Sequence, residues 1–197
     1  MGVVLTIFIT IIIALVIYVI WATGALHKVE VQKTIFPETR IAYVTYIGDY
    51  SQAFKQTSIV EQAIKEKYNT DWSRKPCFGL YYDDPGKTDK EKCRSVVGKF
   101  IPDNFTEKEA PAGITFDVIP RIEPILQIEY PLRSILSIFA GIARAYPAIN
   151  NYTENNNTKI KTAMLEVYGY KSSEILFAGS SNEGTGLWKE FPKDKNE

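Results

Sequence analysis

The first 26 residues of the chain contain no Asp, Glu, Lys or Arg, and all 23 basic and 23 acidic residues follow them. Between Val3 and Trp21 the only polar side chains are two threonines and one tyrosine. In a helix this stretch spans roughly 28 Å, close to the hydrocarbon thickness of a bilayer. No charged residue precedes it, and it is longer than the apolar core of a signal peptide. Residues 1–26 are therefore predicted to form a retained transmembrane anchor and its flank.

The charges beside this anchor predict its orientation. Lys28, Lys33 and Arg40 follow it closely, whereas no Lys or Arg precedes it. Trp21 lies at its C-terminal end, where amphipathic aromatic side chains favour the headgroup layer. The positive-inside rule then places the N-terminus in the lumen and the rest of the chain in the cytosol.

An alternative topology comes from three Asn-x-Thr sequons, at Asn104, Asn151 and Asn156. In a lumenal or secreted protein these would be glycosylation acceptors, and Cys77 and Cys93 could form a disulfide. In the cytosol both thiols would stay reduced. The flank charges favour the cytosolic topology.

Composition excludes several function classes. The formal net charge is zero, without the basic excess typical of a nucleic-acid-binding surface. His27 is the only histidine and the two cysteines form no CxxC pair, which argues against a zinc site, a Cys-His nucleophile and a Ser-His-Asp triad. We therefore expect no metal, no cofactor and no direct nucleic-acid binding.

After a juxtamembrane segment, 27–40, the chain shows one order of elements twice, within a domain expected over 41–180. The first repeat, about 41–101, begins with a β-branched and aromatic strand and continues with a helix at apolar 3.6-residue spacing. The predicted elements are a strand at 41–50, a helix at 51–68, and strands at 77–84 and 93–101.

The second repeat, about 124–180, follows a polar loop and a segment, ITFDVIP, that could itself pair as a strand. Its predicted elements are a strand at 124–130, a helix at 131–152, and strands at 162–170 and 174–180. The helix has apolar residues on more than one stripe, which predicts deep burial, and Pro147 is expected to kink or end it. A short polar tail, 181–197, should follow. Two such repeats predict an α+β domain with pseudo-twofold symmetry.

This duplicated unit resembles the GyrI-like fold of bacterial multidrug-binding effector domains. More specific strings are LYYDDP at 80–85, EKCRSVVG at 91–98, YPLRSILSI at 130–138, YPAI at 146–149 and LEVY at 165–168. With the N-terminal anchor they resemble the family of testis-expressed protein 264. The resemblance implies a single-pass endoplasmic reticulum protein with a cytosolic GyrI-like domain, acting as a receptor in selective autophagy of that organelle and reaching the autophagosome. It also implies ubiquitin-like autophagy modifiers and the valosin-containing ATPase as partners.

The chain departs from this family at its C-terminus, because the long acidic tail that carries the modifier-binding motif is not present in the sequence. That motif has the form aromatic-x-x-aliphatic. Candidates elsewhere are 116–119, 139–142 and 146–149, which we expect to be strand or core residues. Trp188-Lys-Glu-Phe191 is expected to be exposed, but Phe191 replaces the aliphatic residue.

The resemblance also implies a ligand cleft between the repeats, faced by the glutamate of an aromatic/aliphatic-Glu-x-Tyr motif. LEVY matches that motif and assigns Glu166 and Tyr168 to the cleft. Strand alternation places Met164 on their face and turns Leu165 and Val167 toward the helix of the repeat.

On the first repeat, alternation places Tyr81 and Asp83 together on one face of their strand. An aromatic cleft with one carboxylate suits a lipophilic cation. The alternative is that the glutamate is solvated or paired with Lys or Arg. One glutamate without a partner acid is weak support for catalysis.

Two functions from different classes follow. The first is a non-enzymatic membrane adaptor in reticulophagy. The alternative is a membrane-tethered sensor or hydrolase of small molecules that uses the Glu166 cleft.

Overall fold

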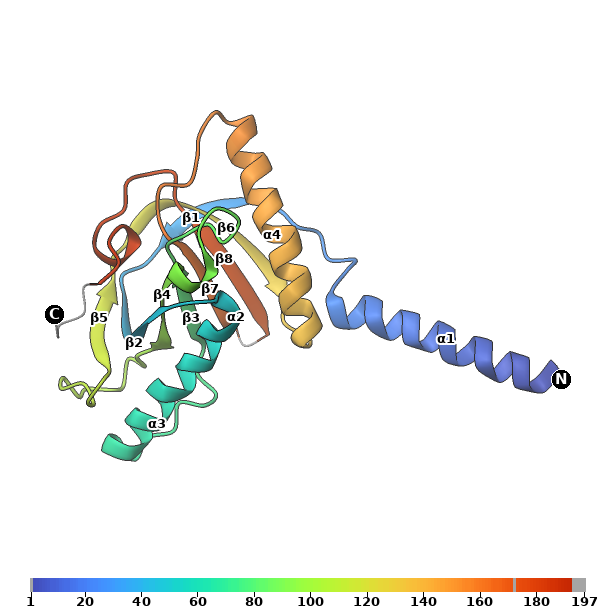
Figure 1. The fold of residues 1–197 in the computed structure, drawn as a ribbon, viewed down its shortest axis with the longest axis horizontal. Helices are drawn as coiled ribbons and strands as arrows, with labels where there is room; N and C mark the ends of the chain where they lie inside the picture. Colours follow the sequence, from blue (N-terminus) through green and yellow to red (C-terminus); the bar gives the residue numbers. More distant parts are fainter. Residues whose placement is uncertain (1, 172, 193–197) are drawn as a thin grey trace.

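The computed structural model describes residues 2–171 and 173–192, which form one long apolar helix followed by an α+β domain (Figure 1). In chain order the helices and strands are α1 (Gly2–Thr23), β1 (Gln32–Phe36), β2 (Thr39–Ile47), α2 (Tyr50–Ala53), η1 (Phe54–Gln56), α3 (Thr57–Tyr68), β3 (Cys77–Tyr81), η2 (Lys90–Lys92), β4 (Arg94–Phe100), β5 (Thr115–Ile119), β6 (Ile122–Pro131), α4 (Ile135–Asn155), β7 (Met164–Tyr170), β8 (Glu174–Gly179) and η3 (Gly186–Trp188).

All eight strands belong to one curled antiparallel sheet in the order β1-β6-β8-β7-β3-β4-β2-β5. The two repeats, β2-α3-β3-β4 and β6-α4-β7-β8, meet at the β3–β7 pair and add their remaining strands outward in mirrored order. This arrangement confirms the predicted α+β fold. The segment ITFDVIP forms the edge strand β5, and β1 lies in the juxtamembrane segment, where we expected no element.

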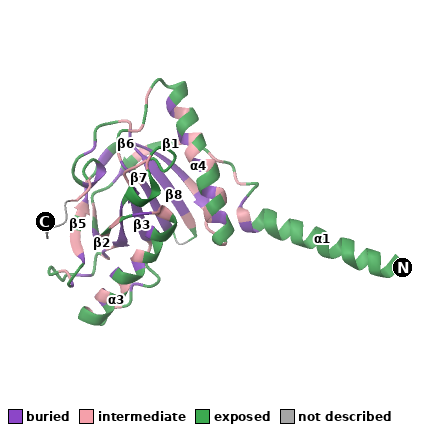
Figure 2. Ribbon diagram, viewed as in Figure 1, coloured by how far each residue is buried: buried purple, intermediate pink, exposed green. Residues whose placement is uncertain are grey.

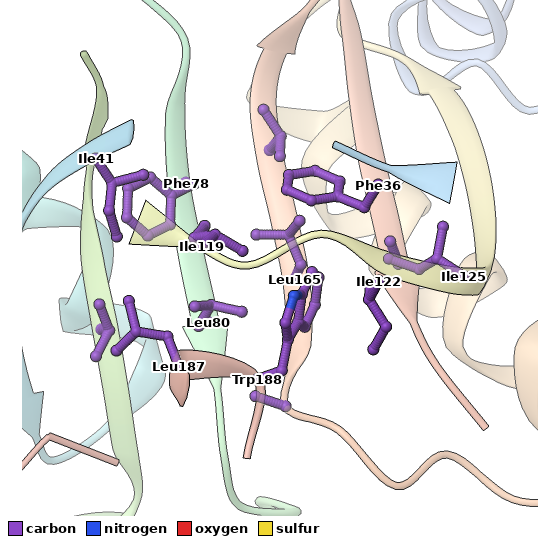
Figure 3. Packing of buried hydrophobic residues seen from close by; sticks show 14 of the residues in the cluster. Phe36, Ile41, Phe78, Leu80, Ile119, Ile122, Ile125, Leu165, Leu187 and Trp188 are labelled. Carbon is purple, nitrogen blue, oxygen red and sulfur yellow. The ribbon is translucent and has the colours of Figure 1, made fainter. Parts of the chain in front are cut away.

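One face of the sheet holds the largest cluster of buried apolar side chains (Figure 3). Leu165 and Val167 of β7 pack there with Phe78 and Leu80 of β3. Trp188 is fully buried among them, and its indole Nε1 donates to the carbonyl of Pro120 at 2.7 Å. The segment 181–192, which we expected to be a polar tail, therefore completes this core. The tail positions beyond 192 lie outside the described residues.

The opposite face of the sheet carries the helices. α3 buries Val60 and Ile64, and α4 buries Ala145 and Ile149. Ser134 caps α4, because its Oγ accepts from the amide of Leu136 while Ser137 completes a capping box. The buried apolar residues thus show that one helix of each repeat packs on the same side of the sheet.

Helix α4 differs from its prediction in two respects. It continues through Pro147 to Asn155, and the carbonyl that loses its partner belongs to Ala143, whose exposed position gives it access to water. It is also half-exposed rather than deeply buried, since Phe139 and Ile142 face outward. Apolar residues on several stripes therefore do not mean burial on all sides here.

α1 has the length and composition to cross a membrane, and its side chains are exposed along almost all of its length (Figure 2). Its C-terminal end is attached to the domain by hydrogen bonds. The Tyr130 hydroxyl donates to the carbonyl of Thr23 at 2.9 Å, and Arg144 donates to the carbonyls of Ala25 and His27 at 3.0 and 2.8 Å. The helix thus leaves the domain from a defined point.

The two cysteines are free and far apart. Cys77 of β3 pairs with Lys99 of β4, and Cys93 lies six residues before Lys99, or roughly 20 Å of extended strand. A disulfide needs Cα atoms within about 7 Å. The prediction of a Cys77–Cys93 disulfide, made for the lumenal alternative, is therefore wrong. The three sequon asparagines are exposed, although Asn151 lies within α4.

Candidate functional site

Glu166 lies at the centre of the sheet, on the strand pair that joins the two repeats. It is 4% exposed and pairs in register with Gly79 of β3. A Cβ on Gly79 would come within 2.6 Å of the Tyr81 hydroxyl, so the glycine makes room for that ring beside the carboxylate. The site is thus built where the pseudo-twofold halves meet.

Two tyrosine hydroxyls hold the Glu166 carboxylate. Tyr146 of α4 donates to Oε1 at 2.7 Å, and Tyr168 of β7 donates to Oε2. Tyr81, on the paired strand β3, lies beside them and completes the cluster. Among the described residues no Lys or Arg pairs with Glu166. The carboxylate is therefore buried with hydrogen bonds but without a counter-ion.

Aromatic rings of the first repeat close over this cluster. Tyr50 packs edge-on against Tyr81 with the ring centroids 4.7 Å apart. Phe54 packs in the same manner on Tyr168 at 4.9 Å, and its own side chain is substantially exposed. Short elements after β2 thus supply the cover, and Phe54 is its outermost ring.

Burial controls the acid-base properties of the cluster. Desolvation raises the pKa of Glu166 above its usual value, and the hydrogen bonds from Tyr168 and Tyr146 offset part of that rise. Desolvation and the nearby carboxylate raise the pKa of Tyr81, Tyr146 and Tyr168 well above the usual value of a phenol. The three hydroxyls are therefore protonated at neutral pH and available as donors.

A groove of about 590 Å³ reaches the surface beside the cluster. Tyr168 and Phe54 form its inner wall, so they separate the groove from Glu166. On its opposite side Lys99 pairs with Glu61 at 2.6 Å and donates to the carbonyl of Lys75 at 2.9 Å. A second hollow, of about 990 Å³, lies between β2 and the C-terminal segment and includes no side chain of the cluster.

The structure brings together most of the predicted cleft residues. Tyr81 and Tyr168 belong to the cluster, and Met164 pairs with Tyr81 at its margin. Asp83 does not, because β3 ends at Tyr81 and the Asp83 carboxylate turns to Arg94, accepting from its Nε at 3.0 Å and Nη2 at 2.8 Å. Arg94 holds the pKa of Asp83 below its usual value. Asp83 is a structural residue of the β3–β4 turn.

The prediction of which face meets the helix was wrong. Glu166 and Tyr168 face α4, whereas Leu165 and Val167 point to the other side of the sheet. The alternative that Glu166 is solvated or paired with a basic residue is also wrong. Tyr146 was expected only as an apolar helix position, and its string YPAI gave no sign that its hydroxyl would reach β7.

The predicted membrane-flank residues are dispersed. Trp21 lies in the last turns of α1, and Lys28 pairs with Glu30 near it. Lys33 lies in β1 over the ring of Tyr152, and the guanidinium of Arg40 donates to the carbonyl of Phe105 inside the domain. Arg133 and Arg144 instead contact the end of α1, a long-range contact that no local pattern reveals.

Among residues 2–171 and 173–192, no group of three His, Cys, Asp or Glu side chains is arranged to hold a metal ion. The chemistry available at the site is thus that of one carboxylate, three phenols and aromatic surface. This combination can bind a ligand that offers positive charge, hydrogen-bond donors and apolar area.

Comparison with known proteins agrees with this geometry. Residues 29–124 match the family described as GyrI-like small molecule binding domain. No curated protein matches the chain in sequence. The family match covers the first repeat and ends at the start of the second, in β6.

Solved structures show the same fold over both repeats. The C-terminal domain of EcmrR superposes with a TM-score of 0.57 at 18% identity, covering 78% of this chain and 97% of that one. The EcmrR–DNA complex gives 0.54 at 18% identity over 77% of this chain and 58% of that one. A hydrolase from Listeria innocua is 11% identical and has a TM-score of 0.44, covering 76% of this chain and 90% of that one.

Proposed function

We propose that the chain is a membrane-anchored binding protein for lipophilic cations, because an apolar helix precedes residues 29–124, which match the family described as GyrI-like small molecule binding domain. The observation that carries the proposal is the Glu166 carboxylate, which is buried among tyrosine hydroxyls and has no cationic partner. A buried carboxylate without a counter-ion is costly. A ligand cation would supply that counter-ion.

The surrounding aromatic rings suit the rest of such a ligand. Tyr50, Tyr81 and Tyr168 offer faces and edges around the carboxylate, and aromatic faces attract cations. The ligand would enter from the 590 Å³ groove. Phe54 and Tyr168 stand between the groove and Glu166, so rotation of these two side chains would open the path.

Tetraphenylphosphonium, a permanent hydrophobic cation, tests this proposal. At about 100 times its dissociation constant it should stabilise the detergent-solubilised chain by roughly 2.7 kcal/mol, measured by thermal unfolding. Glu166→Gln should abolish the shift. Glu123→Gln, an exposed residue paired with Arg121 away from the site, is the matched control and should shift like the wild type. A full shift in Glu166→Gln would refute the role of the carboxylate.

We favour binding over catalysis. Glu166 has tyrosine hydroxyls as its hydrogen-bond partners, and Asp83, the other predicted acid, is held by Arg94 outside the cluster. General acid-base hydrolysis usually needs a second group placed at the reacting atoms. Hydrolysis of p-nitrophenyl acetate that is faster than in buffer, and lost in Glu166→Gln, would instead support the hydrolase alternative.

For location, we propose the endoplasmic reticulum membrane, with the N-terminus lumenal and the domain cytosolic. Lys28, directly after the apolar helix, supports this orientation. Protease added to sealed microsomes should digest the domain. Protection of the domain, together with a mobility shift on glycosidase treatment of the protein from its native host, would establish the lumenal alternative.

We further propose that this membrane protein acts as an adaptor in reticulophagy. The support for this role is the resemblance of strings such as LYYDDP at 80–85 and YPLRSILSI at 130–138. In three of the four candidate modifier motifs one anchor residue, Ile119, Ile149 or Trp188, is buried. The fourth, 139–142, was expected in the core; its Phe139 and Ile142 are exposed, but they lie on helix α4 and not in the extended form in which a peptide adds a strand to a partner. Partner proteins such as the valosin-containing ATPase, or an atypical segment, would then make the link to autophagy modifiers. Unchanged turnover of the endoplasmic reticulum after deletion of the gene would contradict this role, without affecting the ligand proposal.

A further inference from the structure

The first two turns of α4 expose a set of large apolar side chains on one side of the domain. Ile135 and Phe139 are 69% and 64% exposed, and Leu136 and Ile142 are also exposed. The buried side of the same helix consists of Gly141, Ala145 and other small or apolar residues that face the sheet. Side chains of this size seldom cluster at the surface of a soluble domain without a partner.

This apolar set begins directly beside the end of α1. Arg133 Nη1 donates to the carbonyl of Trp21 at 3.0 Å, and Ser134 Oγ donates to the carbonyl of Ala22 at 2.9 Å. Ile135, the first residue of α4, follows these contacts immediately. The start of α4 is therefore fixed at the level where α1 ends.

That level corresponds to the membrane interface if α1 spans a bilayer. Trp21 closes the uncharged apolar stretch, and the Arg133 guanidinium lies 5.7 Å from its ring centroid. Tryptophan and arginine at the end of a spanning helix favour the headgroup layer. In Figure 1, α4 runs across the line of α1 rather than continuing it, and its first turn is the end that lies beside α1.

The exposed side of α4 changes character along its length. Beyond Ile142 the exposed positions include Asn150, Asn151 and Glu154. In Figure 1 the first turn of α4 lies beside the end of α1, and the other end of α4 lies farther from α1. Apolar exposure is thus confined to the half of the helix nearest the end of α1.

We propose that the first half of α4 lies in the interface of the bilayer that holds α1, with Ile135, Leu136, Phe139 and Ile142 among the lipids. Interfacial helices bury an apolar face in this way at the boundary between headgroups and acyl chains. The bilayer is the occupant because hydrogen bonds fix the start of α4 beside the end of α1, the helix that would span it. The inference rests on the membrane anchor of the proposed function.

Fluorescence quenching on the full chain in phosphatidylcholine vesicles tests the proposal. A single NBD fluorophore is attached to Phe139→Cys, to Asn150→Cys as the matched control on the same helix, and to Ile12→Cys in the middle of α1. Cys77 and Cys93 are buried, so the unsubstituted chain serves as the labelling control. Doxyl-labelled lipids quench only probes that contact the acyl or interfacial region.

We expect strong quenching and blue-shifted emission at position 139, with several-fold weaker quenching at position 150. Quenching at position 12 but not at 139 would overturn the inference and leave the anchor intact. A blue shift at 139 without lipid quenching would indicate a second copy or another protein on this face and would also overturn it. Absence of quenching at position 12 would instead refute the membrane anchor itself.

Discussion

The hydroxyl of Tyr146, on helix α4, donates a hydrogen bond of 2.7 Å to Oε1 of Glu166, on strand β7. This contact ties the helix of the second repeat to the strand pair at which both repeats meet. The contact also couples the packing of α4 to the charge of the carboxylate, because loss or gain of a proton at Glu166 changes the strength of this hydrogen bond. Stability and ligand binding should therefore respond together to pH.

Glu166→Gln should stabilise the folded chain at neutral pH by about 1 kcal/mol, because it replaces a buried charge with a neutral amide that can still bond to the tyrosines. The pKa of Glu166 is raised in the folded state. Stability contributed by the protonated form is present below the unfolded pKa, near 4.3, and is lost as pH rises through the folded pKa. The difference between variant and wild type should grow over that window in thermal unfolding, and a pH-independent difference would contradict this account.

Tyr146→Phe should destabilise the domain by about 1.5–3 kcal/mol at a pH where Glu166 is ionised, since a buried carboxylate loses a donor. The pKa of Glu166 should rise further, because the bond from Tyr146 normally lowers it. In a Glu166→Gln background the same change should cost less. Chemical unfolding of the four proteins of this double-mutant cycle measures the coupling, and additive effects would show that the hydroxyl acts elsewhere.

The order of strands and helices could be read from the sequence because it depends on local patterns. The β-branched and aromatic runs at 41–50 and 162–170 predicted β2 and β7, and the cap at Ser134 lies within the predicted helix region. Alternation also identified correctly that Glu166 and Tyr168 share a face. It could not show which face the helix covers, because that depends on the hand of a connection and not on spacing.

The remaining errors concern contacts between distant segments. Asp83 was placed on a strand that ends two residues earlier, and its carboxylate is captured by Arg94 across the turn. Trp188 was expected in an exposed tail, but it is buried and its indole Nε1 donates to the carbonyl of Pro120 at 2.7 Å. Neither partner is near in sequence, and local patterns carry no information about such pairs.

Asp83→Ala should destabilise the chain without affecting binding of a hydrophobic cation. The carboxylate accepts from the backbone amide of Arg94 at 2.8 Å and from its side chain in a bidentate manner. Since Arg94 is half-exposed, we expect a cost of about 1 kcal/mol, below that of a buried pair. The pKa of Asp83 is depressed, so this stability is present above the unfolded pKa, near 3.9, and is lost as pH falls through the folded value. If a folded Asp83→Ala chain were no longer stabilised by tetraphenylphosphonium in thermal unfolding, Asp83 would have to belong to the binding site.

Arg144→Leu should loosen the attachment of α1 to the domain. The guanidinium donates to the carbonyls of Gly24, Ala25 and His27, which form the turn after α1. Leucine keeps apolar volume but removes the guanidinium donor from the carbonyls of Ala25 and His27, while the Gly24 carbonyl keeps the Tyr130 hydroxyl. Limited proteolysis should then cleave faster between residues 24 and 31, while the melting temperature of the domain changes little. Equal cleavage rates in variant and wild type would show that the turn is held by other contacts.

Gly98→Ala should be among the most damaging small substitutions in the chain. Gly98 lies in β4 opposite Tyr43, and a Cβ there would approach the carbonyl oxygen of Ala42 at 2.0 Å and the Cα of Tyr43 at 2.8 Å. Both are backbone atoms of β2, which cannot rotate away as a side chain would, so β2 and β4 would have to separate. We expect a loss of about 3 kcal/mol or more, seen as a lower midpoint in thermal unfolding or as loss of folded protein. Gly86→Ala, exposed and near only a flexible Asp84 side chain, is the control and should change stability little; equal stability of both variants would contradict the close approach of the two strands.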